Sequence, residues 1–354
     1  MLSVSGEYGI INQIEFQGRS FAGESVAEYH VVETNDIVYT KSPLKANPYG
    51  IIKVNNGAPG IVSTLYAVYH PCEGTVAEYI DYYFGNDLRL NKYLKPLVNI
   101  GAKHDMKVNN ETVLTGEVYF PGYSEQKKIV GFLTILDERI RQQRNLVEAL
   151  KKYKRGLHKL VFIKNRKHSW EKSALHDIAS FCGGGTPSKD ISSYWEGEIG
   201  WISSSDIQEE WIDDISVTRR ITKTAIDNSA TKLCPEGTIA IVSRVGVGKV
   251  AIMPESLCTS QDFTNITSIT GNTHYMAYQI AFRMKLEAMK TQGTSIKGVT
   301  ADTIKAMVLD IPPLEEQKKI ADMLTAFDAY IKRAVCELDL FLAMKKALLQ
   351  QLFI

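Results

Sequence analysis

The chain has 354 residues, a formal net charge of +1, 44% hydrophobic and 23% charged residues, which is an ordinary globular composition with room for two or three domains. The sequence contains no run of 18 apolar residues, so no membrane span is predicted. The N-terminus lacks the basic and apolar regions of a secretory signal. The five scattered cysteines contain no CxxC pair and predict reduced thiols in a cytoplasmic protein, with neither disulfides nor a zinc site.

Residues 1–121 predict a first globular region of mixed α and β structure, called here the first head. Short apolar runs alternate with turn signals such as Asn-Gly and Pro-Gly, which is typical of strands joined by tight turns. The predicted elements are strands at 36–40, 50–54, 60–69 and 113–120 and a helix at 76–94.

Residues 122–164 predict a long amphipathic helix. Apolar residues recur at alternating steps of four and three, which is the seam of a coiled coil. About 36 residues without an internal proline would span roughly 55 Å at 1.5 Å per residue. The predicted seam of this helix is Ile129, Leu133, Leu136, Ile140, Val147, Leu150 and Leu157.

The same stretch is strongly basic. Residues 127–167 hold 13 lysines and arginines against three acidic residues. A lopsided positive field attracts DNA phosphates, although a solvated helix surface is an equally acceptable interpretation.

Residues 165–311 predict a second globular region, the second head, which repeats the plan of the first only weakly. The segment from Gly237 matches the segment from Asn35, and a helix at 275–292 and a strand at 307–311 follow. Trp170 lies 67 residues before Gly237, whereas Met1 lies 34 residues before Asn35. We therefore expect the first head to lack about 33 residues at its front.

Residues 312–354 predict a second long helix that repeats the first. Aligned without a gap at an offset of 191, residues 120–163 and 311–354 share 14 of 44 residues, which indicates an internal duplication. Lys154 and Lys345 occupy the same seam position; we expect their stems to pack and their ammonium groups to reach water, and such a lysine can also fix register. The predicted seam of this helix is Ile320, Leu324, Phe327, Ile331, Leu338, Phe341 and Leu348.

Each helix opens with proline followed shortly by Glu-Gln-Lys-Lys-Ile, at 125–129 and 316–320. Two copies of this signature, each opening a heptad helix and each preceded by a variable globular segment, resemble the specificity subunits of type I restriction–modification systems. The resemblance implies an α+β fold in which two mixed α/β target-recognition domains are separated by two long antiparallel helices that form a coiled coil. The implied domains are 1–121, 122–164, 165–311 and 312–354.

The resemblance also implies a non-catalytic role. Such a subunit recognises a bipartite site on double-stranded DNA, one half-site per head, and docks two methyltransferase subunits and, through them, restriction subunits. It carries no cofactor of its own, because S-adenosylmethionine and ATP are expected on the partner subunits.

The residues themselves show no catalytic constellation. The segment Val245–Lys249 imitates a phosphate loop but lacks its first glycine and final hydroxyl, and is predicted to be a hairpin turn. The seven histidines have no metal-ligand spacing. Two alternatives stay open: an enzyme with a fused nuclease or methyltransferase activity, and a coiled-coil scaffold without a DNA role.

Polar loop residues are the remaining candidates for reading DNA. Arginine and glutamine can contact guanine and adenine through two hydrogen bonds, and lysine mainly contacts phosphate. For any one of these residues a solvated surface position is the competing interpretation. The candidates are Arg19, Lys41, Lys45 and Asn47 in the first head, and Lys189, Ser203, Ser205, Arg219, Arg220, Arg244, Lys249, Gln261 and Lys297 in the second.

Overall fold

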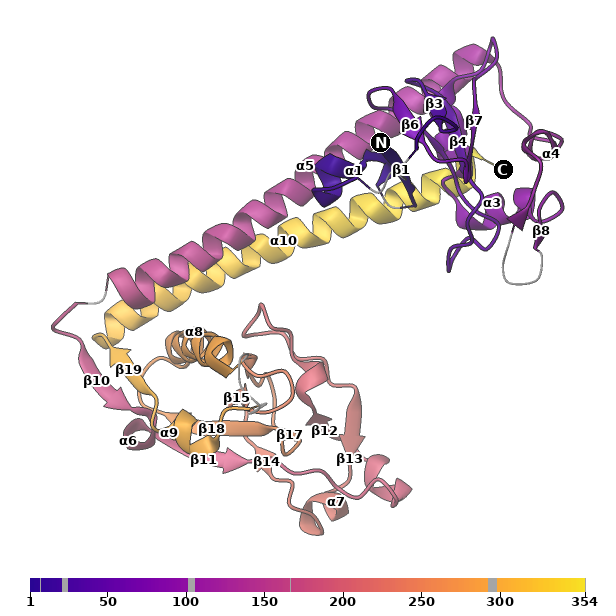
Figure 1. Ribbon diagram of the computed structural model, residues 1–354. Coiled ribbons are helices and arrows are strands. Elements are labelled where there is room, and N and C mark those ends of the chain that lie inside the picture. Colours follow the sequence, from indigo (N-terminus) through magenta and orange to yellow (C-terminus); the bar gives the residue numbers. More distant parts are fainter. Residues whose placement is uncertain (7, 21–24, 101–105, 166, 292–297, 354) are drawn as a thin grey trace. The chain divides into compact units, whose positions relative to one another are not determined.

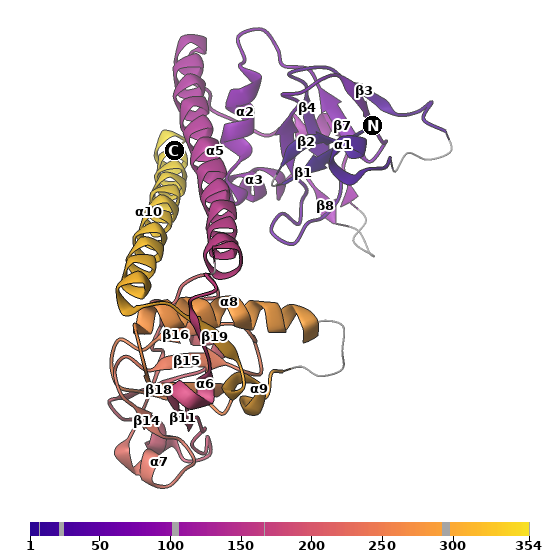
Figure 2. The ribbon, with the colours of Figure 1, turned by 90° about the vertical axis from the view of Figure 1, so that its left-hand side faces the viewer.

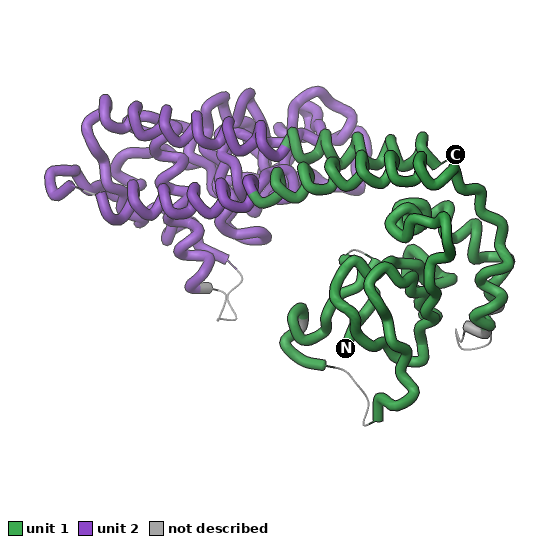
Figure 3. The backbone as a smooth tube through the Cα atoms, turned by 90° about the horizontal axis from the view of Figure 1, so that it is seen from above, with its two compact units in different colours: residues 1–145, 336–354 green, residues 146–335 purple. Residues whose placement is uncertain are grey.

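The structure, a computed structural model, describes residues 1–354 apart from residues 7, 21–24, 101–105, 166, 292–297 and 354. It contains two compact units, a first unit of residues 1–145 and 336–354 and a second unit of residues 146–335 (Figure 3). Each unit combines one head with parts of both long helices. Among the described residues, no helix has the length and apolar content that crossing a membrane requires.

The two longest helices lie where the heptad pattern predicts them (Figure 1). α5 spans Tyr123–Lys159 and continues into a π-helical turn at Leu160–Lys164, and α10 spans Leu314–Leu352. All fourteen predicted seam residues are buried or half-buried. The apolar side chains at heptad spacing are therefore the ones that turn away from water.

Within each unit, α5 and α10 run in opposite directions. A rising residue number on one helix faces a falling number on the other, as in an antiparallel pair. Asp137 is paired with Lys345 and Gln143 with Glu337 in the first unit, and Lys154 is paired with Asp328 in the second. Leu133 and Leu349 belong to one apolar cluster in the first unit, and Val161 and Leu324 to one in the second.

The second unit has three layers. Helix α8 covers one face of an antiparallel sheet of order β11-β18-β15-β16 (Figure 2), and a second sheet of order β13-β12-β17-β14 covers the other face. Alternation along β15 explains this: Ile239 and Ile241 pack toward α8, while Ala240 and Val242 pack toward the second sheet. The bounds are α8 Thr273–Thr291, β11 Ala179–Gly183, β18 Phe263–Ile269, β15 Ile239–Val242, β16 Val250–Ile252, β13 Arg219–Ile221, β12 Ile199–Ile202, β17 Leu257–Thr259 and β14 Leu233–Cys234.

The first unit has the same order of layers. Helices α2 and α3 cover a sheet of order β5-β4-β7, whose other face packs on the pair β3-β6. In both units the central strand follows a left-handed residue at equivalent positions, Asn35 with φ 74° and Gly237 with φ 79°. The bounds are α2 Ala77–Phe84, α3 Asp87–Leu94, β5 Ile52–Val54, β4 Ile37–Thr40, β7 Tyr66–Tyr69, β3 His30–Val32 and β6 Gly60–Val62.

Shorter elements complete the two units. β10 pairs antiparallel with β19 just before α10 begins. The bounds are β1 Leu2–Ser5, β2 Gly9–Asn12, α1 Gln13–Gln17, β8 Asn99–Ile100, β9 Met106–Lys107, α4 Asn110–Val113, β10 Glu171–Ala174, α6 Leu175–Ile178, α7 Lys223–Asp227, α9 Ala301–Lys305 and β19 Val308–Ile311, with 3₁₀ turns at Ser192–Trp195 and Ser204–Asp206.

Three predicted elements of the first head were wrong. The helix predicted at 76–94 is two helices, because Gly85 ends α2 and the Asn86 side chain caps the N-terminus of α3. The single strand predicted at 60–69 is interrupted by a turn at Ser63, so that β6 and β7 belong to different sheets. The strand predicted at 113–120 is absent: residues 110–113 are helical, and residues 114–122 form neither helix nor strand.

Candidate nucleic-acid interface

One edge of the second unit gathers the connections that follow four strands. β11 and β15 both pair antiparallel with β18 and so run in one direction, and β12 runs parallel to β17. The connections 184–189, 203–206, 243–249 and 260–262 follow these strands, and we call them the loop surface. They are tied together by hydrogen bonds of 2.8 Å from Gly185 N to Thr259 O, from Ser243 N to Asp262 O and from Lys249 Nζ to Ser204 O.

The loop surface includes the segment that imitates a phosphate loop. Residues 243–249 connect the antiparallel strands β15 and β16, so the predicted hairpin is confirmed. Gly246 and Gly248 have φ values of 83° and 103°, which a side chain would strain.

Most candidates of the second head lie on or beside the loop surface. Lys189, Ser205, Arg244 and Gln261 are exposed there, and Ser203, Arg219 and Lys249 are half-buried. Arg220 is exposed on β13, and its Nη1 donates to the carbonyl of Glu198 at 2.6 Å. Lys297 lies outside the described residues. The sequence therefore picked out residues that the fold brings to one edge.

A hollow of about 580 Å³ opens beside these loops. Arg244 and Gln261 line it, together with Lys305 at the end of α9, and the Thr186 hydroxyl is hydrogen-bonded to Gln261. Lys305 was not among the predicted residues. It lies on a short helix far along the chain from Arg244 and Gln261, and no local sequence pattern predicts that it lines the same hollow.

The connection after β12 holds a compact polar cluster around Asp206. This carboxylate is 6% exposed and accepts hydrogen bonds from Ser203 N, Ser203 Oγ and Thr218 Oγ1 at 2.7, 2.8 and 2.7 Å. Arg219 Nη2 lies 3.0 Å from Asp206 Oδ2 and 2.6 Å from Ser203 Oγ. The Arg219 guanidinium also lies 4.5 Å from the centre of the Trp201 ring.

The ionisation of Asp206 follows from these contacts. Burial alone would raise the pKa of its carboxyl, but hydrogen bonds from Ser203, Thr218 and Arg219 together hold the pKa below its usual value. Asp206 is therefore an anion at neutral pH. It was not among the predicted site residues, although Ser203 followed three residues later by Asp206 is a recognisable capping sequence.

In the first head, three candidates occupy the connection after β4, which corresponds to the connection after β15. Lys45 is exposed and Lys41 is half-buried. Asn47 is only 6% exposed, and its amide donates to Asp87 at 2.9 Å, so this side chain holds its own loop together. Arg19 is exposed after α1.

The basic stretch 127–167 is partly neutralised. Among the described residues of this stretch, four cations pair with carboxylates, which reduces the positive field available to a phosphate backbone. The pairs are Arg141 with Glu138, Lys151 with Glu210, Lys154 with Asp328 and Lys167 with Glu316, at 2.6, 3.1, 2.7 and 2.7 Å.

The glutamine of the repeated signature makes the same contacts in both units. Gln126 and Gln317 are each 3% exposed. Gln126 accepts from Val76 N and donates to Pro121 O, both at 2.9 Å. Gln317, the equivalent residue, accepts from Asn272 N and donates to Pro312 O, both at 2.8 Å. In each unit one amide thus joins the start of the head helix to the start of the long helix.

A second repeated contact joins three residues in each unit. Asp328 accepts from the Tyr278 hydroxyl at 2.9 Å and lies 2.7 Å from Lys154 Nζ. At the equivalent positions, Asp137 accepts from the Tyr82 hydroxyl at 2.9 Å and lies 2.5 Å from Lys345 Nζ. Each lysine pairs with the aspartate of the other long helix.

The Lys154 pair corrects the expectation that this seam lysine ends in water. The side chains of Lys154 and Asp328 are 13% and 3% exposed. Burial lowers the pKa of Lys154 and raises the pKa of Asp328, and each partner's charge opposes the other's shift. The ammonium group is therefore held inside the seam by a carboxylate.

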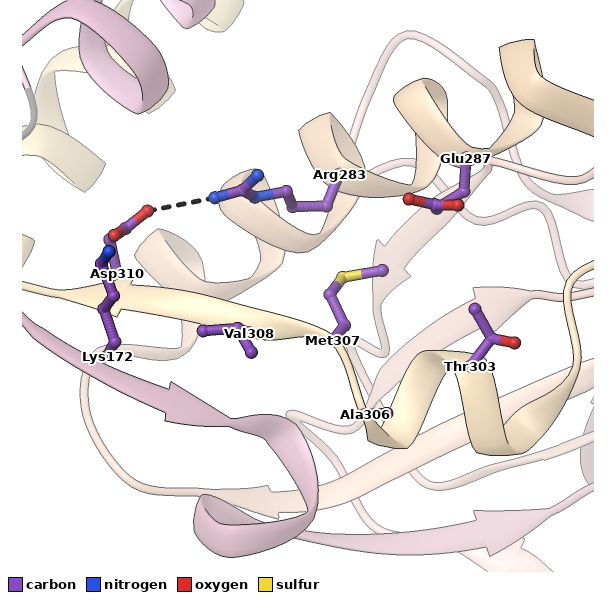
Figure 4. Close-up of a pocket in the computed structure, with 8 residues that line it drawn as sticks. All are labelled: Lys172, Arg283, Glu287, Thr303, Ala306, Met307, Val308 and Asp310. Atoms are coloured by element: carbon purple, nitrogen blue, oxygen red, sulfur yellow. Dashed lines mark hydrogen bonds and ion pairs between the residues drawn. The ribbon is translucent and has the colours of Figure 1, made fainter.

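A separate hollow of about 600 Å³ lies between α8, α9 and β19 (Figure 4). Arg283 crosses it to Asp310, at 3.1 Å, and Met307 and Val308 line its apolar part. Its lining residues are not among the predicted DNA-binding residues. We therefore assign no role in DNA reading to this hollow.

The second unit matches a described protein family. Residues 167–335 match the family described as type I restriction modification DNA specificity domain. The loop surface and the Asp206 cluster lie inside this range. Two solved structures share the fold: one from work on complex assembly and conformational transition of the type I R-M system, with a TM-score of 0.59 and 16% identity over 93% of this chain and 84% of that one, and the S subunit from M. genitalium, with 0.56 and 12% over 91% and 84%.

Two curated proteins are similar to parts of this chain. The type I restriction enzyme MjaIX specificity subunit of Methanocaldococcus jannaschii is 34% identical over 46% of this chain and 39% of its own length. A type I restriction enzyme specificity subunit of Escherichia coli is 30% identical over 58% of this chain and 51% of its own length. The chain thus spans about two-fifths to half of the length of these two proteins and is similar to them over that part.

Proposed function

We propose that this chain is the non-catalytic specificity subunit of a type I restriction–modification complex in the cytoplasm. In this proposal the heads at 1–121 and 165–311 each read one half-site of double-stranded DNA. The helices at 122–164 and 312–354 form an antiparallel coiled coil that sets the unread spacer between the half-sites. Partner subunits bind S-adenosylmethionine and ATP and carry out the chemistry.

One observation carries the proposal. Residues 191 positions apart make the same hydrogen bonds and ion pairs in both units, through Gln126 and Gln317 and through Asp137 and Asp328. Two equivalent frames holding two different heads suit a DNA site made of two different half-sites, since DNA itself has a dyad. The loop surface supplies the polar side chains that base reading needs.

Exposed apolar side chains on the long helices support the docking of two identical partners. Phe132 and Ile135 on α5 are 51% and 67% exposed, and Met323, the equivalent of Phe132 on α10, is 42% exposed. Exposed apolar patches commonly mark interaction sites. Because the duplication repeats this feature, we propose that each helix receives one methyltransferase subunit.

The experiment is single-molecule sequencing of methylated bases in a host that carries this chain and its methyltransferase. We expect methylation at a bipartite motif with a constant spacer, and loss of that motif when the chain is deleted. Methylation that persists without the chain would contradict the proposal. A gel shift with the methyltransferase present and absent, at several salt concentrations, distinguishes a DNA reader from a scaffold.

The enzymatic alternative has its own test. Purified without partners, the chain should transfer no methyl group from S-adenosylmethionine to DNA and should not cleave DNA. Turnover by the isolated chain would show that it is an enzyme.

A further inference from the structure

The guanidinium of Arg219 in the second head is fixed from two sides. Its Nη2 donates to Ser203 Oγ and lies 3.0 Å from Asp206 Oδ2, and the flat group lies 4.5 Å from the centre of the Trp201 ring. Trp201 is 2% exposed and its indole N–H donates to the carbonyl of Gly185, so the surface beneath the guanidinium is itself rigid. We infer that Arg219 determines specificity by reading a guanine in the half-site of the second head, and that Asp206 and Trp201 position it.

The unused part of the guanidinium suits this role. Within the described part of the chain, Nη1 and Nε of Arg219 have no hydrogen-bond partner, and 38% of the side chain is exposed. An arginine reads guanine through two N–H groups that reach O6 and N7 in the major groove. Because the side chain is already ordered, binding does not have to freeze its rotamers, which favours affinity and a fixed geometry.

A purely structural role for Arg219 explains the geometry less well. Asp206 already accepts hydrogen bonds from Ser203 N, Ser203 Oγ and Thr218 Oγ1. Removing Arg219 would therefore leave the buried carboxylate with partners. In this arrangement the aspartate positions the arginine.

Three neighbouring cations are not held between a carboxylate and an aromatic ring in this way. Arg220 is exposed and donates to the carbonyl of Glu198, and Lys249 donates to the carbonyl of Ser204. Arg244 is exposed at the rim of the 580 Å³ hollow. A lysine supplies a point charge for phosphate, whereas a fixed guanidinium supplies direction.

The test rests on the proposed function and compares methylated motifs in hosts that carry the wild-type chain, Arg219→Lys, Arg219→Ala, Asp206→Asn or Lys223→Ala. We expect both Arg219 variants to accept other bases at one guanine of one half-site, with discrimination there falling about 10- to 100-fold. Asp206→Asn should relax the same position to a smaller extent. Lys223→Ala, at a lysine on α7 that is 83% exposed and is not among the candidates, is the control and should leave the motif unchanged. The other half-site serves as an internal control in every variant.

The outcomes separate the inference from the function on which it rests. An unchanged motif in both Arg219 variants would overturn the inference. Uniformly weaker methylation at every site by a variant whose melting temperature is unchanged would also overturn it, since that pattern belongs to a phosphate contact. If the wild-type chain directs no motif at all, the proposed function fails first.

Discussion

Lys154 Nζ lies 2.7 Å from Asp328 Oδ1, and the residues equivalent to these two, Lys345 and Asp137, are paired in the same way at 2.5 Å. Each pair joins α5 to α10, so a shift of one helix along the other by a turn would separate both pairs together. Each aspartate also accepts a tyrosine hydroxyl from the head helix beside it. The two ion pairs therefore favour one register of the helices, and the two tyrosine hydrogen bonds connect the first head to α5 and the second head to α10.

Removing one charge of the more buried pair should destabilise the second unit. Lys154→Met keeps the apolar stem but leaves the 3% exposed Asp328 carboxylate without a cation, and such a loss costs about 3–5 kcal/mol. In the double variant Lys154→Met with Asp328→Asn, the uncompensated charge is gone and most of that loss should be recovered. Urea denaturation of the wild-type chain, the single variant and the double variant measures the free energy of unfolding.

Lys345→Met is the matched control, because that pair is more exposed, at 28% and 36%. Its loss should be clearly smaller, since water screens the carboxylate that remains. Equal losses at the two positions would show that burial does not decide the strength of these pairs.

The repeated glutamine should matter more than its polarity suggests. Gln317→Leu leaves the N–H of Asn272 and the carbonyl of Pro312 without their partner, and each unsatisfied buried group costs about 1–3 kcal/mol. We expect a loss of about 2–6 kcal/mol in the free energy of unfolding, and Gln126→Leu should act similarly in the first unit. A neutral Gln317→Leu would mean that water replaces the amide.

His158 predicts a pH dependence of stability. Burial, followed by the charges of Lys154 and Lys285, lowers its pKa to about 3. Since the unfolded chain binds the proton near pH 6.5, the stabilisation is present above pH 6.5 and is lost as the pH falls toward 3.

The measurement compares the free energy of unfolding at pH 7 and pH 5. This histidine should account for a loss of about 2 kcal/mol in the wild-type chain, and His158→Leu should not show that part of the loss. Parallel pH profiles for the two chains would show that the imidazole becomes protonated without cost in the fold.

Matched insertions test whether the helices set the spacer. Gln143 and Glu337 face each other across the helix pair at 3.2 Å. Seven residues added after each, in heptad pattern, would keep the seam in register and lengthen both helices by about 10 Å. We expect the methylated motif to gain about three base pairs of spacer, at 3.4 Å per base pair. An unchanged spacer in a stable variant would contradict the ruler role.

The proposed docking surfaces predict a stoichiometry. Phe132→Glu should remove one methyltransferase subunit from the complex, Met323→Glu the other, and the double variant both, because a carboxylate in an apolar interface is costly to desolvate. Native mass spectrometry of the assembled complex counts the subunits. The exposed Lys128→Glu serves as a charge control on the same helix. Full assembly of the double variant would place the interface elsewhere.

The sequence predicted the long helices well because periodicity is a repeated signal. Leu133, Ile140 and Val147 recur at one spacing, and all three are buried. The head contacts of those helices could not be predicted in the same way. No local sequence signal near Asp137 predicts its hydrogen bond with the Tyr82 hydroxyl, which lies 55 residues earlier.

Local signals explain the errors in the first head. Gly85 and Asn86 together are a helix stop and a helix cap, yet the apolar pattern on both sides suggested one continuous helix. In the second head, Arg219 was singled out as one cation among many. Only the fold shows that Trp201 and Asp206 hold it, since pairing of β12 with β13 places Trp201 opposite Arg219.

The paired contacts of Gln317 and Asp328 set the conditions for grafting a foreign head onto this frame. A transplanted domain needs a backbone N–H where Asn272 offers one and a phenol where Tyr278 does, while its loops are free to vary. A graft without the phenol would leave the Asp328 carboxylate with its ion pair to Lys154 and would lose the hydrogen bond that joins the head helix to α10. These two positions, together with the apolar face that α8 packs against Val161 and Leu324, are the part of a donor domain that must match this frame.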